Sequence, residues 1–314
     1  MRRFKKILKW IGIIIVFLVA GITITVMFRQ NLKYDRPYPA ITATADSSVI
    51  SHGRQIVMGA AHCADCHSPT NNDSIIALGQ EVPLTGGYVF DLPVGKIYSR
   101  NITPDNETGI GKLTDAEIAR SLRYGVHPDG TAIFDFMPFH NMTDEDLTAV
   151  ISYLRAQKPV RNKVPSNTLN ILGRVVNAFM VQPVGPTGTV AEKIKIDSTA
   201  AYGQYLAVNV ANCAGCHTDR DMMTGAFIGE PFAGGPKFEE KLGTFFPPNI
   251  TPDSTSRIFG WSKENFIARF RMGRLRPGSP MPWPSYKRMS DNDLTAVYNY
   301  LKTVKPVRSK PEHR

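Results

Sequence analysis

Two short clusters of cysteine and histidine contain the residues of this chain that are best suited to chemistry. Both have the pattern C-x-x-C-H, which begins at position 63 and again at position 213. The members are Cys63, Cys66 and His67 in the first cluster and Cys213, Cys216 and His217 in the second. This pattern is the attachment site of a c-type haem, in which the two thiols bond to the porphyrin and the histidine binds its iron. The sequence therefore predicts two haem c groups.

Three other uses of paired cysteines fit these clusters less well. A redox-active dithiol has no need of a histidine directly after the second cysteine. A zinc site would need two further ligands close to each pair, and no second C-x-x-C or H-x₃-H pattern lies within reach. A disulfide network would not explain why all four cysteines of the chain occur in this one pattern.

The second axial ligand of each iron decides what the iron can do. An open iron suits peroxide or oxygen chemistry, whereas a methionine sulfur suits electron transfer. Met137 and Met281 each precede a proline, which disfavours helix at the residue before it, and they occupy matching places in the two halves. We therefore predict Met137 and Met281 as the axial ligands. Met142 and Met289 also match, but they stand at the start of an apolar helix and are expected in the core.

Four further histidines occur only in the first half, namely His52, His62, His127 and His140. A ligand required by both sites should appear in both halves, so we interpret these residues as surface or haem-edge histidines. His140 is the rival to Met137, because it follows that residue closely.

Two other matching pairs have polar side chains that could serve the haem. Asn101 and Asn249 open a repeated N-I-T-P-D segment, where each could cap a loop or bind a haem propionate; the sequence leaves both roles open. Arg123 and Arg271 also match, and a planar guanidinium suits a propionate carboxylate.

The chain as a whole is two copies of one unit. Besides the cysteine clusters, N-I-T-P-D, M-P and L-T-A-V each occur twice and in the same order. Each copy predicts a short helix before the cysteines (53–61 and 203–210), a middle helix starting at Thr114 or Ser262, and a last helix starting at Thr143 or Ser290. Long loops rich in Gly and Pro connect them, including 82–104 and 229–252.

This pattern predicts an all-α fold of two tandem cytochrome c-type domains with long loops. The domains span 47–160 and 197–308, and a linker spans 161–196. The linker's middle, 169–181, is apolar. It could be a surface helix against either domain or against lipid, and the sequence leaves that choice open.

The N-terminus predicts one transmembrane helix. A basic leader, 1–9, precedes nineteen uncharged residues, 10–28, which are long enough to cross a bilayer. A basic leader stays in the cytoplasm, so the haem domains are expected on the periplasmic side of a bacterial inner membrane. The alternative is a cleaved signal peptide, which also exports the rest. Half of the net charge of +10 lies in this leader, and no basic stripe elsewhere indicates nucleic-acid binding.

The ordered motifs resemble the cytochrome c subunits of periplasmic dehydrogenases over about 47–308. In each copy, C-x-x-C-H is followed by a G-G loop, N-I-T-P-D, a helix that ends at Gly125 or Gly273, M-P and a D-x-D-L helix. The resemblance implies all-α haem domains, with iron held by His67 and Met137 and by His217 and Met281. It also implies electron flow from a membrane-bound alcohol, aldehyde or gluconate-type dehydrogenase to quinone or a terminal oxidase.

The chain departs from that family in two ways. Many family members carry three haems and an anchor near the C-terminus, whereas this chain has two attachment sites and its apolar segment comes first.

An electron carrier with no substrate of its own is therefore the leading interpretation. Its partners would be a periplasmic dehydrogenase or oxidase subunit, other redox proteins and the membrane. The alternative is a di-haem peroxidase-type enzyme, which would need one iron without a firm second ligand; the matching methionines disfavour it. A haem-based sensor is a third class, and no signalling domain indicates it.

Overall fold

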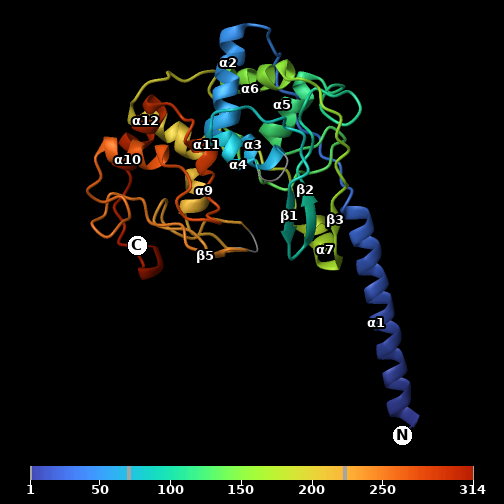
Figure 1. The fold of residues 1–314 in the computed structure, drawn as a ribbon. Helices are drawn as coiled ribbons and strands as arrows, with labels where there is room; N and C mark the ends of the chain where they lie inside the picture. Colours follow the sequence, from blue (N-terminus) through green and yellow to red (C-terminus); the bar gives the residue numbers. More distant parts are fainter. Residues whose placement is uncertain (1, 69–71, 222–224, 314) are drawn as a thin grey trace.

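The computed structural model describes residues 2–68, 72–221 and 225–313. Helix α1 (Arg2–Arg29) projects away from the remainder of the chain, which forms two groups of helices side by side (Figure 1). Within the described residues α1 is the one helix long and apolar enough to cross a membrane. A signal sequence near an N-terminus can pass the same test of length and composition.

The first group of elements contains the first cysteine cluster. In chain order it comprises α2 (Ser47–Gln55), the π-helix η1 (Ile56–Ala60), α3 (Cys63–His67), α4 (Asp73–Ala77), β1 (Val89–Leu92), β2 (Gly95–Tyr98), α5 (Asp115–Tyr124) and α6 (Asp144–Ala156). The linker then contributes β3 (Thr168–Leu169) and α7 (Ile171–Phe179).

The second group comprises α8 (Ala200–Tyr205), the π-helix η2 (Leu206–Val210), α9 (Cys213–His217), β4 (Phe238–Glu240), β5 (Gly243–Phe245), α10 (Lys263–Arg271), α11 (Trp283–Tyr286), α12 (Asp291–Leu301) and the 3-10 helix η3 (Pro311–His313). The order α2, η1, α3, α5 and α6 of the first group recurs in the second group as α8, η2, α9, α10 and α12. We call residues 41–162 the first half and residues 197–313 the second half.

The predicted starts of the middle and last helices are confirmed. The Thr114 hydroxyl oxygen accepts a hydrogen bond from the Glu117 amide, and the Thr114 amide donates to the Glu117 carboxylate. This pair of hydrogen bonds is a capping box. The hydroxyl oxygens of Ser262, Thr143 and Ser290 accept amide hydrogen bonds at the starts of α10, α6 and α12, and at Ser290 the contact is again a capping box.

The first and last helices of each half cross in close contact, α2 on α6 and α8 on α12. Glycine permits this crossing. A Cβ atom added to Gly53 would lie 1.9 Å from the Ala149 carbonyl oxygen, and one added to Gly203 would lie 1.9 Å from that of Ala296. The repeat therefore extends to backbone contacts as well as to motifs.

The helices that lead into the cysteines differ from their prediction at the start. They begin at Ser47 and Ala200, because Asp46 and Thr199 cap the free amides there. Both then change to π-helix before they end. Two residues after each π-helix, His62 and Asn212 have left-handed backbone with φ of 41° and 50°. This turn redirects the chain and starts α3 and α9.

The prediction of an all-α fold is only partly right, because the structure also contains short strands. Strands β1, β2 and β3 form an antiparallel sheet in which Val89 pairs with Tyr98 and Gly95 with Leu169. Strands β4 and β5 form a hairpin. Both hairpins lie inside the segments 82–104 and 229–252 that were predicted as loops.

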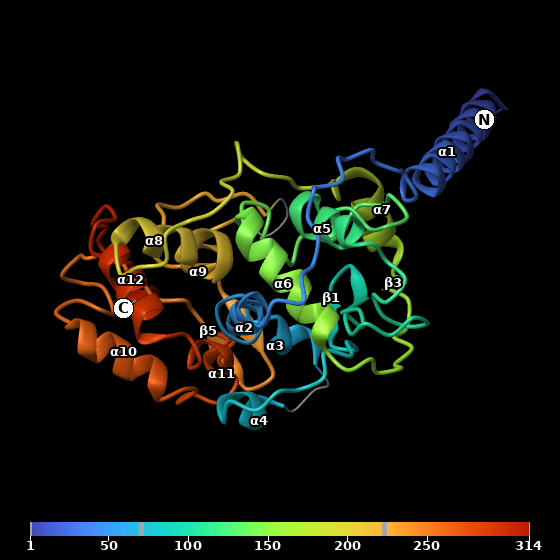
Figure 2. The same ribbon diagram turned by 90° about the horizontal axis from the view of Figure 1, so that it is seen from above.

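Polar contacts join the two halves in two places, around α11, which packs against η1 and α4 (Figure 2), and between α8 and α6. The Ser285 hydroxyl donates to Asp65 at 2.6 Å, and the Tyr205 hydroxyl donates to Asp146 at 2.5 Å. Arg274 pairs with Asp73 at 3.0 Å. These contacts fix how the two cysteine clusters are placed relative to each other.

Candidate functional site: two Cys-His clusters and their methionines

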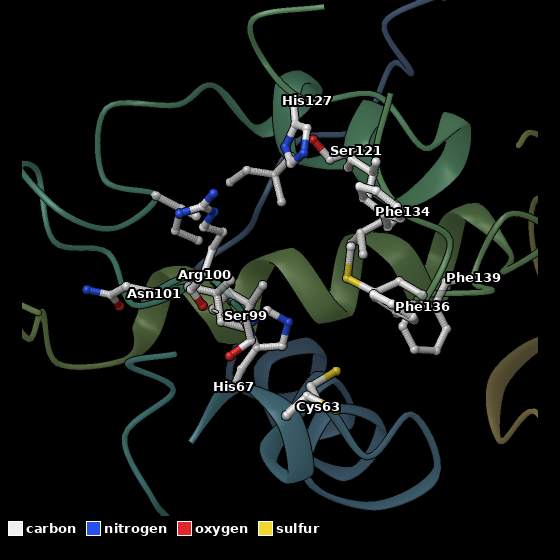
Figure 3. Close-up of a pocket in the computed structure, with 18 of the residues that line it drawn as sticks. Cys63, His67, Ser99, Arg100, Asn101, Ser121, His127, Phe134, Phe136 and Phe139 are labelled. Atoms are coloured by element: carbon white, nitrogen blue, oxygen red, sulfur yellow. Dashed lines mark hydrogen bonds between the residues drawn. The ribbon is translucent and has the colours of Figure 1, made fainter. Parts of the chain in front are cut away.

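The first cysteine cluster lines a cavity between α3, α5, α6 and β2. Figure 3 shows Cys63 and His67 on one side of it and aromatic side chains opposite. Most of the wall is apolar and includes Ile97, Leu113, Leu122, Phe134, Val150 and Leu154. Cys66 and Met137 line the same cavity. The structure thus brings together all four residues predicted for the first site.

The imidazole of His67 is held in the form that binds a metal. Its Nδ1–H donates to the Arg100 carbonyl oxygen at 2.7 Å, which leaves Nε2 without a proton. Burial lowers the pKa of His67, which favours the uncharged form of the ring. A neutral imidazole with one nitrogen fixed by a backbone carbonyl is a typical iron ligand.

The second half repeats this arrangement. The Nδ1–H of His217 donates to the Pro248 carbonyl oxygen at 2.8 Å, and burial again lowers the pKa of the ring. Arg100 and Pro248 each stand directly before the asparagine of N-I-T-P-D. The repeated segment therefore supplies the carbonyl that orients each histidine.

The two asparagines of that segment hold its loop in shape. The Asn101 amide donates to the Val160 carbonyl at 2.8 Å, while its oxygen accepts the Thr103 amide at 3.0 Å. Asn249 donates likewise to the Val307 carbonyl at 2.6 Å and accepts from Thr251 at 2.8 Å. Of the two roles left open by the sequence, loop capping is the one these contacts support.

Both predicted methionine ligands lie in non-helical loops, as the following proline favours. The Phe139 amide donates to the Met137 carbonyl at 2.8 Å, and the Trp283 amide donates to the Met281 carbonyl at 2.7 Å. Pro282 has φ −76° and ψ 58°, the values of an inverse γ-turn. Met137 and Met281 are both partly buried and pack against the hydrophobic core.

Met142 and Met289 are buried in the core as expected, with 1% and 5% of their surfaces exposed. Met142 also reaches the wall of the first cavity.

One histidine of the first half lies closer to the candidate site than the sequence indicated. His127 lines the cavity across from His67 (Figure 3), and burial lowers its pKa. The sequence argument against His127 as a ligand was only that the second half has no matching histidine. His140, the expected rival of Met137, contacts the Arg123 carbonyl at 3.3 Å and Asp135 at 2.9 Å. Both nitrogens of His140 therefore already have partners.

The sequence suggested that the two matching arginines bind haem propionates, but both are already paired with aspartates. Arg123 is buried and donates to Asp144 at 2.7 Å. Arg271 donates to Asp291 at 2.5 Å and to the Met289 carbonyl at 2.7 Å. The aspartates are the first residues of α6 and α12, so these arginines fix the start of each last helix.

The donors and the wall of the first cavity fit a haem c. Burial raises the pKa of Cys63 and Cys66 to about 12, which keeps both thiols uncharged beside the apolar wall. A neutral imidazole and a thioether sulfur complete the set, and these are the axial donors of electron-transfer cytochromes.

Comparison with known proteins confirms the resemblance to dehydrogenase cytochrome subunits. Residues 200–305 match the cytochrome c family model. The chain is 28% identical to the fructose dehydrogenase cytochrome subunit of Gluconobacter japonicus, over 90% of this chain and 58% of that protein. It is 29% identical to the cytochrome c subunit of the quinone alcohol dehydrogenase of Gluconacetobacter polyoxogenes, over 85% of this chain and 58% of that one.

A smaller protein is also similar. The diheme cytochrome c-type protein of Cereibacter sphaeroides is 28% identical over 81% of this chain and 85% of its own length. The chain thus spans less than two thirds of the two dehydrogenase subunits and most of this diheme protein.

Proposed function

We propose that this chain is a cytochrome c subunit that carries electrons through two covalently attached haem c groups. The observation that carries the proposal is that Cys63, Cys66, His67 and Met137 line one apolar cavity. The same residue types recur in the second half, where a backbone carbonyl orients His217 as another orients His67.

The residues of each half have separate tasks in this proposal. Cys63 and Cys66, or Cys213 and Cys216, attach the porphyrin, while His67 or His217 binds the iron from one side. Met137 or Met281 closes the other side. A haem bound in this way supplies an iron that accepts and releases single electrons. The apolar wall excludes water, and a sulfur ligand favours the reduced iron.

We place each haem in a domain of its own, at 47–160 and 197–308. The single N-terminal helix anchors both in the cytoplasmic membrane of a bacterium, with the haems on the periplasmic side. The leader of basic residues before the apolar stretch supports that orientation.

The partner we propose is a periplasmic dehydrogenase, which would pass electrons through this chain toward the respiratory chain. The names of the fructose and alcohol dehydrogenase cytochrome subunits support this class of partner. The chain itself is then a carrier and not the enzyme that oxidises the substrate.

Haem content and spin state test the proposal. The purified chain should contain two haem c groups by pyridine haemochrome and mass, and each paired Cys→Ala variant (C63A with C66A, or C213A with C216A) should lose one. Both irons should be low-spin, with the near-red absorption of sulfur-ligated ferric haem. A high-spin iron in the protein as isolated would contradict the carrier and favour the peroxidase-type alternative.

A further inference from the structure

Helix α7, in the linker, has an apolar face that the protein leaves uncovered. Ile171 is 83% exposed, Leu172 56% and Phe179 44%, and Val175 lies on the same side of the helix. Residues 171, 172, 175 and 179 fall within one stripe at 3.6 residues per turn. A contiguous apolar stripe on an ordered helix marks a contact surface.

The opposite side of α7 fixes the helix to the rest of the chain. At its first turn, the Asn170 side chain donates to the Pro93 carbonyl at 2.8 Å. A Cβ atom on Gly173 would lie 1.9 Å from the Val94 oxygen, so the backbones are in direct contact. The turn between β1 and β2 therefore holds the start of α7.

The other end of α7 packs against the end of α1. Arg29 donates to the Ala178 carbonyl at 3.1 Å, and its guanidinium lies 5.0 Å from the centre of the Phe179 ring. The Asn177 side chain donates to the Gln30 carbonyl at 3.1 Å. Figure 1 shows α7 beside the end of α1 that joins the rest of the molecule.

The length of α1 fixes the depth at which α7 lies. Nineteen uncharged residues, 10–28, span about 28 Å as a helix, which matches the hydrocarbon core of a bilayer. Arg29 then stands at the outer surface, where basic side chains reach the lipid headgroups. Because α7 contacts Arg29 and Gln30, its exposed stripe lies at the same level.

We propose that α7 is a membrane-surface helix whose apolar stripe inserts into the outer leaflet beside the anchor. Arg174, on the flank of the stripe, is exposed and suits a lipid phosphate. With α1 and α7 both in lipid, the first half has two points of attachment and a fixed tilt. This inference rests on the proposed transmembrane anchor.

Labelling of a single new thiol tests α7 directly, because the native cysteines are consumed by haem attachment. Full-length Leu172→Cys and Ile196→Cys would be placed in nanodiscs of phosphatidylethanolamine and phosphatidylglycerol and treated with a charged maleimide. Ile196 is the matched control, since it is 52% exposed and precedes α8, which lies on the far side of the molecule from α1 (Figure 2). The thiol at 172 should react about tenfold more slowly, because it must first leave the lipid.

Two outcomes separate a failure of this inference from a failure of the anchor. Release of the wild-type chain from membranes by alkaline carbonate would overturn the anchor, and the inference with it. Retention in carbonate together with equal labelling at 172 and 196 would overturn the role of α7 alone.

A separate observation concerns the boundary between the two haem sites. The rings of His62 and Tyr286 meet edge to face, 5.5 Å apart and at 84°. His62 directly precedes Cys63. The Tyr286 hydroxyl donates to the carbonyl of Ala211, two residues before Cys213. A chain of contacts thus joins the two attachment clusters.

We infer that this His62–Tyr286 contact is the path by which one electron crosses from one haem site to the other. Tyr286 is 5% exposed, so water does not enter the contact from its side. With haem attached at both clusters, the two residues would act as positioning residues that supply packed contacts between the attachment sites, and the passage of one electron would break no bond. This inference rests on the proposal that both clusters bind haem.

Flash photolysis tests the path. After photoreduction of one haem, electron equilibration between the haems should be severalfold slower in Tyr286→Leu than in the wild type. Tyr205→Leu is the control, because Tyr205 also joins the halves but contacts Asp146 and Thr143 instead. Equal rates in Tyr286→Leu and wild type, or equal slowing in both variants, would overturn the path. A chain with fewer than two haems would instead contradict the proposed function.

Discussion

The orientation of each candidate iron ligand depends on one backbone carbonyl. His67 donates to Arg100 and His217 donates to Pro248, and both acceptors precede N-I-T-P-D. The sequence predicted the ligands and displayed the repeated segment, but separately. It could not connect them, because a hydrogen bond to a carbonyl depends on backbone position and leaves no trace in residue type.

Replacement of Met137 separates the two possible ligands on the far side of the first cavity. Met137→Leu should remove the near-red band of one haem and lower its potential by about 0.1 V, within the range that axial ligands control. Potentiometric titration with optical detection measures both effects. His127→Ala is the matched control and should leave them unchanged. The opposite pattern would make His127 the ligand.

His52 predicts a pH dependence of stability. It binds Asp146 at 2.6 Å, and this hydrogen bond raises the pKa of the imidazole above its usual value of 6.5. Because the pKa is higher in the folded protein than in the unfolded chain, the stabilisation is complete below pH 6.5. It is lost as the pH rises through the pKa that His52 has in the folded protein. His52→Gln should therefore cost about 1–2 kcal/mol at pH 6 and little at pH 9.

Thermal unfolding of the two proteins at both pH values measures the effect of His52. The quantity to compare at each pH is the difference in stability between wild type and His52→Gln. Burial lowers the pKa of His127, which makes both proteins more stable as pH rises, and this common contribution cancels in the difference. A difference that is the same at pH 6 and pH 9 would contradict the prediction.

At the level of elements, the helices were predictable where local chemistry defines them. Caps at Thr114, Thr143, Ser262 and Ser290 use side chains that the sequence displays directly. The sheets were missed because their pairing is short or distant. Strand β3 has only two residues, and α5 and α6 separate it in the sequence from its partner β2. No hairpin turn connects the two strands, so the sequence has no local signal for their pairing.

The helix crossing in the second half predicts a large effect of a small substitution. Gly203→Ala places a methyl group against the Ala296 carbonyl, where backbone leaves no room, and should lower the free energy of unfolding by about 2 kcal/mol. Chemical denaturation followed by circular dichroism measures it. Gly188→Ala in the linker meets nothing within 4 Å and should leave stability unchanged or slightly higher. Equal effects of the two variants would refute close packing at the crossing.

On the scale of the whole molecule, each half ends with a segment that returns to its own N-I-T-P-D loop. Val160 and Asn162 contact the first loop, and Val307, Ser309 and His313 contact the second. The sequence shows the motif twice, but it does not show that a later segment packs against each copy. Most of those contacts involve backbone groups of the later segment, which residue types do not reveal.

Deletion of residues 307–314 should therefore disturb one site and spare the other. The second loop would lose the groups that bind Asn249, so His217 would no longer be held and its haem should become high-spin or fail to attach. The first site provides the control within the same molecule. Haem content by mass and electron paramagnetic resonance of the oxidised protein measure the result. Two undisturbed low-spin haems would contradict the role of the segment.

These returning segments also set an order of maturation. A chain that is exported N-terminus first delivers residue 162 to the periplasm well before residue 313. The first half then has every group that closes its loop while the second half is still arriving. On the export route proposed above, the first haem is attached to a half that can already fold, and the second must wait for residues 307–313.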